Sequence, residues 1–95
     1  MTMERDKRRE IYREALSKYG MENQVFMVME EVGELLSALG KANRGRLSSP
    51  MEVITEIADV SIMMEQMAES FGYENYLKEK DYKINRLKER LDKYN

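Results

Sequence analysis

The sequence predicts an all-α fold, a four-helix chain with a central antiparallel helical hairpin, in a bundle that is completed by oligomerisation. Three observations support this prediction. Glycine, proline and serine are concentrated in a few places, around Gly20, over residues 44–50 and at Gly72. Between these places apolar residues recur at intervals of three and four, without the alternation typical of strands. At 95 residues we expect a single domain, 1–95, whose thin core favours self-association.

The first helix is expected over about residues 4–19, where a few apolar side chains lie among charged ones. Gly20 suits the left-handed conformation that often ends a helix. The second helix is expected over about residues 22–43, because its apolar residues form one stripe along the helix. That stripe consists of Val25, Val28, Val32, Leu35 and Leu39.

The third helix has the clearest start signal in the chain. Ser49 can cap the helix, Pro50 fits its first position and Glu52 completes a capping box. We expect this helix to run to about residue 71, and its apolar stripe consists of Val53, Ile57, Val60, Met64, Met67 and Phe71.

The fourth helix is expected over about residues 74–94. Leu77, Ile84 and Leu91 are spaced seven residues apart, as in helices that pack against another helix. The pattern predicts a helical partner for this segment.

Two pairs of acidic residues lie beside the stripes of the second and third helices. Glu31 and Glu34 follow one flank of the second helix, and Glu56 and Asp59 follow the flank of the same hand in the third. If the short loop makes the two helices antiparallel neighbours, these flanks meet and the four carboxylates converge. Such a cluster repels itself unless a cation lies within it. The alternative is that each acid is solvated or paired with a lysine.

Composition narrows the kind of metal site and the kind of partner. The chain has no cysteine and no histidine, so a metal must bind oxygen ligands, which favours Mg2+, Mn2+ or Ca2+ over zinc or copper. The net charge of −2, with mixed signs, disfavours binding to nucleic acid or to an anionic membrane. No apolar run resembles a signal peptide or a membrane span, so we expect a cytoplasmic location.

A carboxylate site for Mg2+ points to phosphate chemistry, because Mg2+ usually completes its shell with water and substrate phosphate oxygens. Glu31 or Glu34 is the candidate to accept the proton of an attacking water. Other side chains are candidate substrate contacts, although each has a solvated surface role as its alternative. They are Lys41, Arg44 and Arg46 near the loop, Lys83, Arg86 and Arg90 in the fourth helix, and the amides of Gln24 and Asn85.

The run of residues 30–39, followed by residues 56–60, resembles the MazG-like branch of the all-alpha NTP pyrophosphatase superfamily, whose motif is E-x-x-E followed by E-x-x-D. The resemblance covers about residues 24–71. It implies a homo-oligomer, a dimer or a tetramer, with sites partly made by neighbouring chains. It also implies Mg2+-dependent cleavage of a nucleoside triphosphate into the monophosphate and pyrophosphate. The metal ligands would be Glu31, Glu34, Glu56 and Asp59, with Lys41, Arg44 and basic residues of the fourth helix as phosphate contacts.

Other functions are also compatible with these residues. A dUTPase-like or phosphoribosyl-ATP pyrophosphatase-like member of the same superfamily is one alternative, although the chain is short for the first and lacks a histidine expected in the second. A non-catalytic helical homo-oligomeric interaction module is another. The enzyme predicts stabilisation by Mg2+ and the module predicts none.

Overall fold

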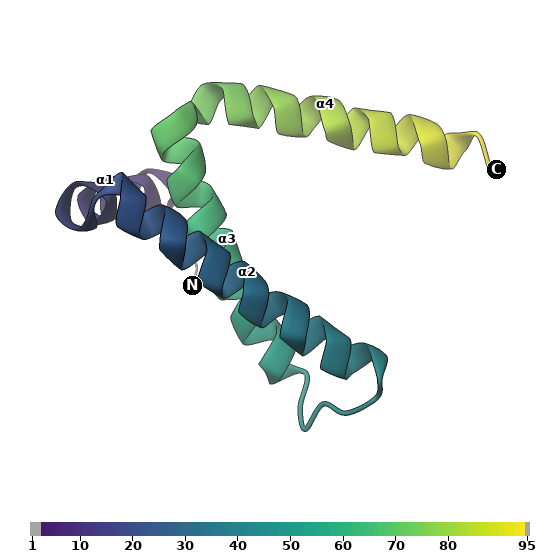
Figure 1. Cartoon of the computed structure of the whole chain (residues 1–95). Helices are drawn as coiled ribbons and strands as arrows, with labels where there is room; N and C mark the ends of the chain where they lie inside the picture. The colour runs from purple at the N-terminus through teal and green to yellow at the C-terminus, as the bar shows by residue number, and fades with distance from the viewer. Residues whose placement is uncertain (1–2, 95) are drawn as a thin grey trace.

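The computed structural model describes residues 3–94, and this part of the chain contains four α-helices and no β-strand. The predicted all-helical class and the order of the helices are confirmed (Figure 1). None of the described helices is both long and apolar enough to cross a membrane. The helices are α1 (Arg5–Tyr19), α2 (Met21–Asn43), α3 (Met51–Phe71) and α4 (Tyr73–Asp92).

Single glycines separate α1 from α2 and α3 from α4. Gly20 has φ +86° and Gly72 has φ +137°, a region that side-chain-bearing residues rarely adopt. The N–H of Gly20 donates to the carbonyl oxygen of Leu16, while its own carbonyl accepts from Gln24, so one residue closes one helix and opens the next. The chain therefore changes direction sharply at both glycines, and α4 leaves the end of α3 at a steep angle (Figure 1).

The start of α3 is stabilised by the polar side chains that the sequence predicts for it. The hydroxyl of Ser49 accepts from the N–H of Met51 at 3.1 Å, and the carboxylate of Glu52 accepts from the N–H of Ser49 at 3.4 Å. The helix itself begins at Met51, directly after Pro50. These are the contacts of a capping box, and they satisfy backbone donors that the helix leaves free.

Helices α2 and α3 lie side by side and make the most extensive contact in the fold (Figure 1). Near the start of α2, Gln24 donates to Gln66 toward the end of α3, at 2.6 Å. Near the end of α2, Lys41 donates to Glu52 at the start of α3, at 2.8 Å. These two pairs set the register of the helices along the face where they meet, which we call the seam.

The seam does not consist of the expected apolar stripes. Its buried positions are Gln24 and Ala38 on α2 and Met63 and Gln66 on α3. At about 100° per residue, the seam face of α3 lies roughly a quarter turn from the stripe that the sequence indicates. The apolar stripes therefore lie beside the seam, and much of their surface is exposed. Their exposed members include Val25, Leu39, Ile57, Met64 and Phe71.

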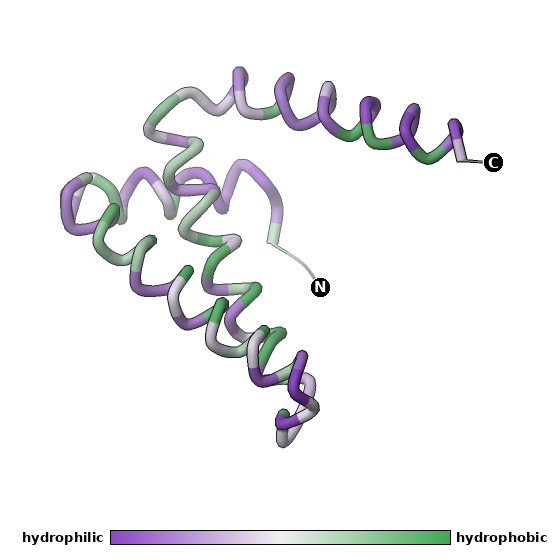
Figure 2. Tube along the Cα trace, turned by 45° about the vertical axis from the view of Figure 1, so that its right-hand side comes forward, coloured by the Kyte–Doolittle hydropathy of each residue, from purple (hydrophilic) through white to green (hydrophobic). Residues whose placement is uncertain are grey.

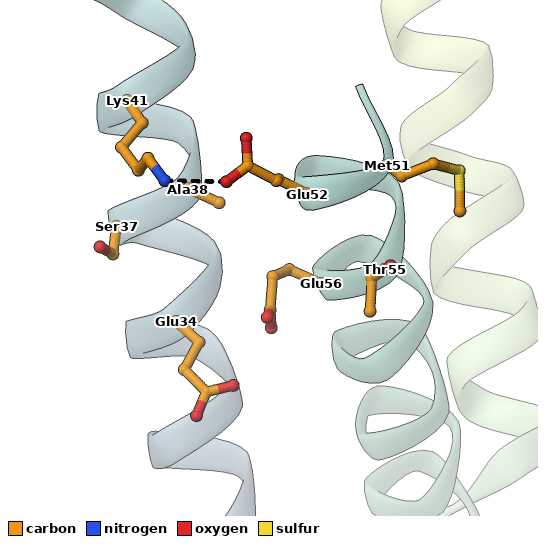
Figure 3. A pocket seen from close by; sticks show the side chains of 8 residues that line it. All are labelled: Glu34, Ser37, Ala38, Lys41, Met51, Glu52, Thr55 and Glu56. Carbon is orange, nitrogen blue, oxygen red and sulfur yellow. Dashed lines mark hydrogen bonds and ion pairs between the residues drawn. The ribbon is translucent and has the colours of Figure 1, made fainter. Parts of the chain in front are cut away.

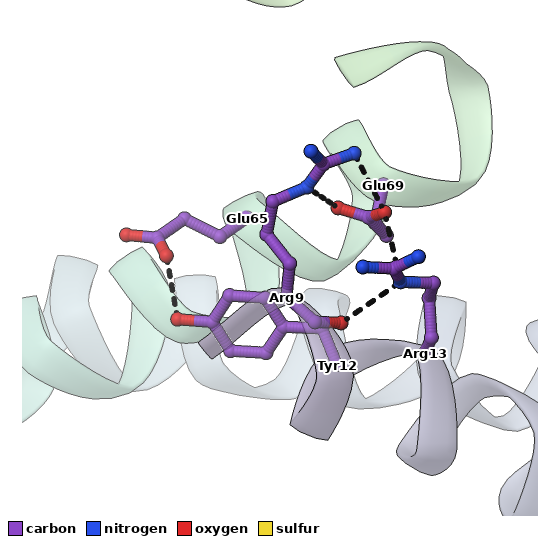
Figure 4. Close-up of polar contacts among 5 residues, drawn as sticks. All are labelled: Arg9, Tyr12, Arg13, Glu65 and Glu69. Carbon is purple, nitrogen blue, oxygen red and sulfur yellow. Dashed lines mark hydrogen bonds and ion pairs between the residues drawn. The ribbon is translucent and has the colours of Figure 1, made fainter. Parts of the chain in front are cut away.

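Helix α1 is held across α3 mainly by polar contacts (Figure 4). Arg9 forms two hydrogen bonds with the buried carboxylate of Glu69, at 2.8 and 3.0 Å, and Arg13 reaches the same carboxylate at 3.3 Å. The buried Tyr12 donates its hydroxyl to Glu65 at 2.5 Å. Charge pairing, rather than a large apolar core, therefore fixes this helix.

Within the described residues, α4 packs against α3 near its start, where the ring of Tyr73 also lies under the guanidinium of Arg9 on α1, 3.8 Å from ring centre to guanidinium carbon. Helix α4 contains no buried residue. Hydrophobic residues recur along one side of it (Figure 2), and Ile84, Leu87 and Leu91 are each more than half exposed. The radius of gyration is 16.1 Å, against about 12.4 Å for a compact chain of this length. The described chain is therefore more open than a typical globular monomer.

Candidate metal centre

The predicted acidic residues come from two adjacent helices. Glu31 and Glu34 lie on α2, and Glu56 and Asp59 lie on α3. The members of each pair are three residues apart, so they project from one side of their helix about one turn from each other. Because that side of each helix is the seam side, the two pairs come together where α2 and α3 meet.

Three of these residues form a tight set, which we call the acidic cluster. One carboxylate oxygen from each of Glu31, Glu56 and Asp59 lies within 4.8 Å of the other two, and all three residues are half-buried. Glu34 is more exposed and lies outside this set, but it faces Glu56 across the seam (Figure 3). The structure thus brings three of the four predicted ligands together and places the fourth beside them.

Two oxygens of the acidic cluster have no partner. Within the described part of the chain, Oε2 of Glu31 and Oε2 of Glu56 are buried and accept no hydrogen bond. Buried polar atoms are nearly always paired, because an unpaired one has lost its hydration without replacement. Such orphaned carboxylate oxygens are free to act as ligands of a bound cation.

The electrostatics of the cluster agree with this geometry. Burial raises the pKa of Glu31, and the nearby charges of Glu34, Asp59 and Glu56 raise it further. Burial likewise raises the pKa of Glu56, with added contributions from Glu34 and Asp59. The neighbouring carboxylates thus destabilise the charged forms of Glu31 and Glu56, and either a proton or a cation relieves the repulsion. The ligand set is all oxygen, so it fits Mg2+ or Mn2+.

An open groove of about 550 Å³ runs along the seam from the acidic residues toward the loop between α2 and α3 (Figure 3). Glu34 and Glu56 lie at its acidic end, and Lys41 and Glu52 lie at its loop end. The groove therefore combines two carboxylates of the predicted metal site, Glu34 and Glu56, with the ammonium group of Lys41. Its lining residues are Glu34, Ser37, Ala38, Lys41, Met51, Glu52, Thr55 and Glu56.

The other predicted substrate contacts lie at different distances from the groove. Arg44 ends α2, and its guanidinium lies against the backbone of Gly40. Gln24 is only 6% exposed and is bonded to Gln66 in the seam.

Lys83 and Arg86 lie on α4, and neither is among the residues that line the groove in this chain. Lys83 forms an ion pair with Glu79 of the same helix at 3.8 Å. A role for either residue in substrate binding stays a prediction, as it does for Gln24 and Arg44.

The sequence did not single out Ser37 and Thr55, which line the groove, one on each helix. It did single out Lys41, but not the pairing of Lys41 with Glu52. The available signal was the helical spacing: position 41 lies seven residues after Glu34, and position 52 lies four residues before Glu56. Because the seam was expected on the apolar stripes, these positions were expected at its edge rather than in it.

Comparison of the chain with protein-family models, curated proteins and solved structures gives no match. The features of the chain that bear on its function are the acidic cluster, its orphaned oxygens and the groove that begins beside it.

Proposed function

We propose that this chain is a Mg2+-dependent nucleoside triphosphate pyrophosphohydrolase, similar to the MazG-like branch of the all-alpha NTP pyrophosphatase superfamily. It would cleave the bond between the α and β phosphates and release the nucleoside monophosphate and pyrophosphate. One observation carries the proposal: three half-buried carboxylates from two helices lie within 4.8 Å of one another, and two of them have an orphaned oxygen. That arrangement is costly unless a cation binds it.

In this proposal Glu31, Glu56 and Asp59 hold the metal ions, with Glu34 as a further ligand or as the base. Bound Mg2+ would neutralise phosphate charge and make a water more acidic. Glu34 suits the task of taking that water's proton, because it lines the groove but lies outside the tight set of three. Glu31, which lies about one helical turn before Glu34 on α2, is the alternative base.

Lys41 is the phosphate contact that this chain itself supplies, because it lines the groove. Arg44 lies one turn further along α2, at the helix end. Lys83 and Arg86 extend away on α4, so their contribution to a substrate would be made in a neighbouring copy of the chain. A base-reading role for Gln24 would require its amide to leave Gln66.

We also propose that the chain is a dimer or a tetramer in which the central antiparallel hairpin of α2 and α3 is completed by other copies. The accessible surface is 7,645 Å², roughly 1,900 Å² more than the approximately 5,700 Å² typical of a compact monomer of this mass. Obligate interfaces bury about 1,000–2,500 Å² on each partner. The exposed stripes beside the seam and along α4 supply apolar surface for such contacts.

The test is release of pyrophosphate from a panel of ordinary and modified nucleoside triphosphates, with Mg2+, with Mn2+ and with chelator. Wild type is compared with Glu56→Gln, which removes one charge of the acidic cluster, and with Glu22→Gln, a matched change at an exposed residue in the first turn of α2. We expect metal-dependent release that Glu56→Gln abolishes and Glu22→Gln retains. The same panel separates dUTPase-like from broader activity.

A non-catalytic, homo-oligomeric interaction module is the second candidate, favoured by the exposed heptad-like stripe of α4. Such a module would release no pyrophosphate and would gain no thermal stability from Mg2+ or Mn2+. Observing both results together would favour it over the enzyme. The cytoplasmic location expected from the sequence stays a prediction.

A further inference from the structure

The loop end of the groove contains a lysine and an acid that are bound to each other. The ammonium of Lys41 donates to Oε1 of Glu52 at 2.8 Å (Figure 3). The other carboxylate oxygen, Oε2, accepts from the backbone N–H groups of Ser48 and Ser49, at 2.6 and 3.4 Å. Glu52 is therefore anchored to the loop backbone on one side and holds Lys41 on the other.

The pKa of Glu52 is shifted in the opposite direction to those of Glu31 and Glu56 in the acidic cluster. Hydrogen bonds from Lys41 and from the backbone of Ser48 lower the pKa of Glu52, whereas burial and like charges raise those of Glu31 and Glu56. Glu52 is thus ionised and already has partners for both oxygens. It does not need a cation, and its evident effect is to fix the position of a lysine.

Lys41 keeps capacity for a further ligand. An ammonium group has three N–H donors, and one is directed to Glu52. The side chain is 42% exposed and lines the groove, so its other donors are accessible. Held in place at one point, this lysine can bind an anion in the groove without first being ordered.

The spacing of the groove suits a linear chain of phosphates. Lys41 lies seven residues after Glu34, about 10.5 Å along α2, and Glu52 lies four residues before Glu56, about 6 Å along α3. The ammonium and the metal-binding carboxylates thus mark opposite ends of one groove. A linear polyphosphate with one phosphate at the carboxylates can therefore extend along the groove to Lys41.

We propose that Lys41, positioned by Glu52, binds the terminal phosphate of a linear triphosphate, so that the groove selects triphosphates over diphosphates. Glu52 is a positioning residue in this inference, because it acts through Lys41. The inference rests on the proposed function for the location of the metal-bound phosphates. The inference adds an orientation of the substrate, with its last phosphate toward the α2–α3 loop. It also gives a reason for a preference for longer phosphate chains.

The experiment measures binding of inorganic pyrophosphate and inorganic tripolyphosphate by calorimetry, with Mg2+ present. We expect wild type to bind tripolyphosphate about tenfold more tightly than pyrophosphate, the effect of one charge-assisted hydrogen bond at a partly exposed site. Lys41→Met and Glu52→Gln should lose most of this difference while keeping their affinity for pyrophosphate. Lys88→Met removes a lysine that is paired with Asp92 on α4, and this control should behave as wild type.

Glu52→Gln keeps an oxygen that can accept from the loop backbone, so circular dichroism should show the helix content of wild type. Three results would overturn the inference: wild type binds neither anion, Lys41→Met retains the tripolyphosphate preference, or Glu52→Gln binds tripolyphosphate more tightly than wild type. The last result would mean that Glu52 competes for Lys41 instead of positioning it.

Turnover separates this inference from the proposed function. If wild type hydrolyses no triphosphate but shows a chain-length preference that both variants lose, the inference stands and the enzyme proposal fails. If wild type hydrolyses triphosphates and Lys41→Met leaves the ratio of KM values for nucleoside di- and triphosphates unchanged, the inference fails and the enzyme proposal stands.

Discussion

The amide pair of Gln24 and Gln66 allows a sharp test of the seam. Both side chains are only 6% exposed, and the amide nitrogen of Gln24 donates to the amide oxygen of Gln66 at 2.6 Å. Gln24→Leu keeps a side chain of similar size but leaves that oxygen buried without its donor. A buried acceptor without a partner costs about 1–3 kcal/mol, so we expect the free energy of unfolding to fall by about that amount.

A second substitution should reverse most of this loss. In Gln24→Leu/Gln66→Leu both amides are gone, and replacing both partners of a buried hydrogen bond by apolar groups is often nearly neutral. The double variant should therefore be more stable than the Gln24→Leu variant, with a coupling of about 1–2 kcal/mol in the double-mutant cycle. Urea unfolding followed by circular dichroism measures all four proteins at one protein concentration, because oligomerisation makes stability concentration-dependent.

Asn23→Leu is the matched control, since this neighbouring amide is exposed and its hydrogen bond goes to the carbonyl oxygen of Tyr19, the last residue of α1. It should change stability by no more than about 0.5 kcal/mol. A cost for Gln24→Leu as small as that of the control would refute the buried pair. So would a double variant less stable than Gln24→Leu. The double variant also tests the substrate role of Gln24 in the turnover assay. If the Gln24 amide contacts the base, the base preference of the double variant should differ from that of wild type.

Three further predictions concern the acidic cluster and α1. Asp59→Asn should abolish the rise in thermal midpoint caused by Mg2+, because Asp59 belongs to the acidic cluster. It should leave the metal-free fold at least as stable, because one source of repulsion is gone. Differential scanning fluorimetry with and without chelator measures both effects, and a collapsed fold would contradict a metal role. Without metal, the stability that Glu31 and Glu56 contribute should be lost as pH rises from about 4.5, the ordinary pKa, through their raised pKa values, because the folded state keeps these protons longer than the unfolded state. Wild type should therefore lose stability relative to Glu31→Gln across this range, as urea midpoints measure, and an identical pH dependence of the two proteins would contradict the repulsion. Burial and a hydrogen bond to the carboxylate of Glu65 raise the pKa of Tyr12 to about 12. Tyr12→Phe removes that hydrogen bond and should lower the free energy of unfolding by about 1.5 kcal/mol. Chemical unfolding measures this change, and an unchanged midpoint would mean that the packing of α1 does not depend on the hydrogen bond.

Local signals predicted the helices well. Gly20 and Gly72 separate helices as expected, since positive φ at these positions is available to glycine and costly for other residues. The Ser49 and Glu52 contacts at the start of α3 are also those that the sequence indicates. Such features depend on residues a few positions apart in the chain, so a single sequence contains all the information they need.

The rotation of α2 and α3 about their own axes was not predicted. Their most apolar faces were expected to meet, but the seam consists of Gln24, Ala38, Met63 and Gln66, with the acidic cluster between them. An apolar stripe shows that a face needs cover, and it does not show which surface covers it. In a chain that exposes so much apolar area, the covering surface need not belong to the same chain.

By itself, the sequence determined the helices, their order, the carboxylate pairs at helical spacing and the absence of histidine and cysteine. Only the tertiary structure decided that Glu31, Glu56 and Asp59 form a tight set with orphaned oxygens, and that Glu52 is bonded to Lys41 instead of joining them. The physical reason is that spacing along a helix fixes the direction of a side chain relative to its own helix. Its partners are set by how that helix is turned and placed against another, which depends on packing between residues far apart in the chain.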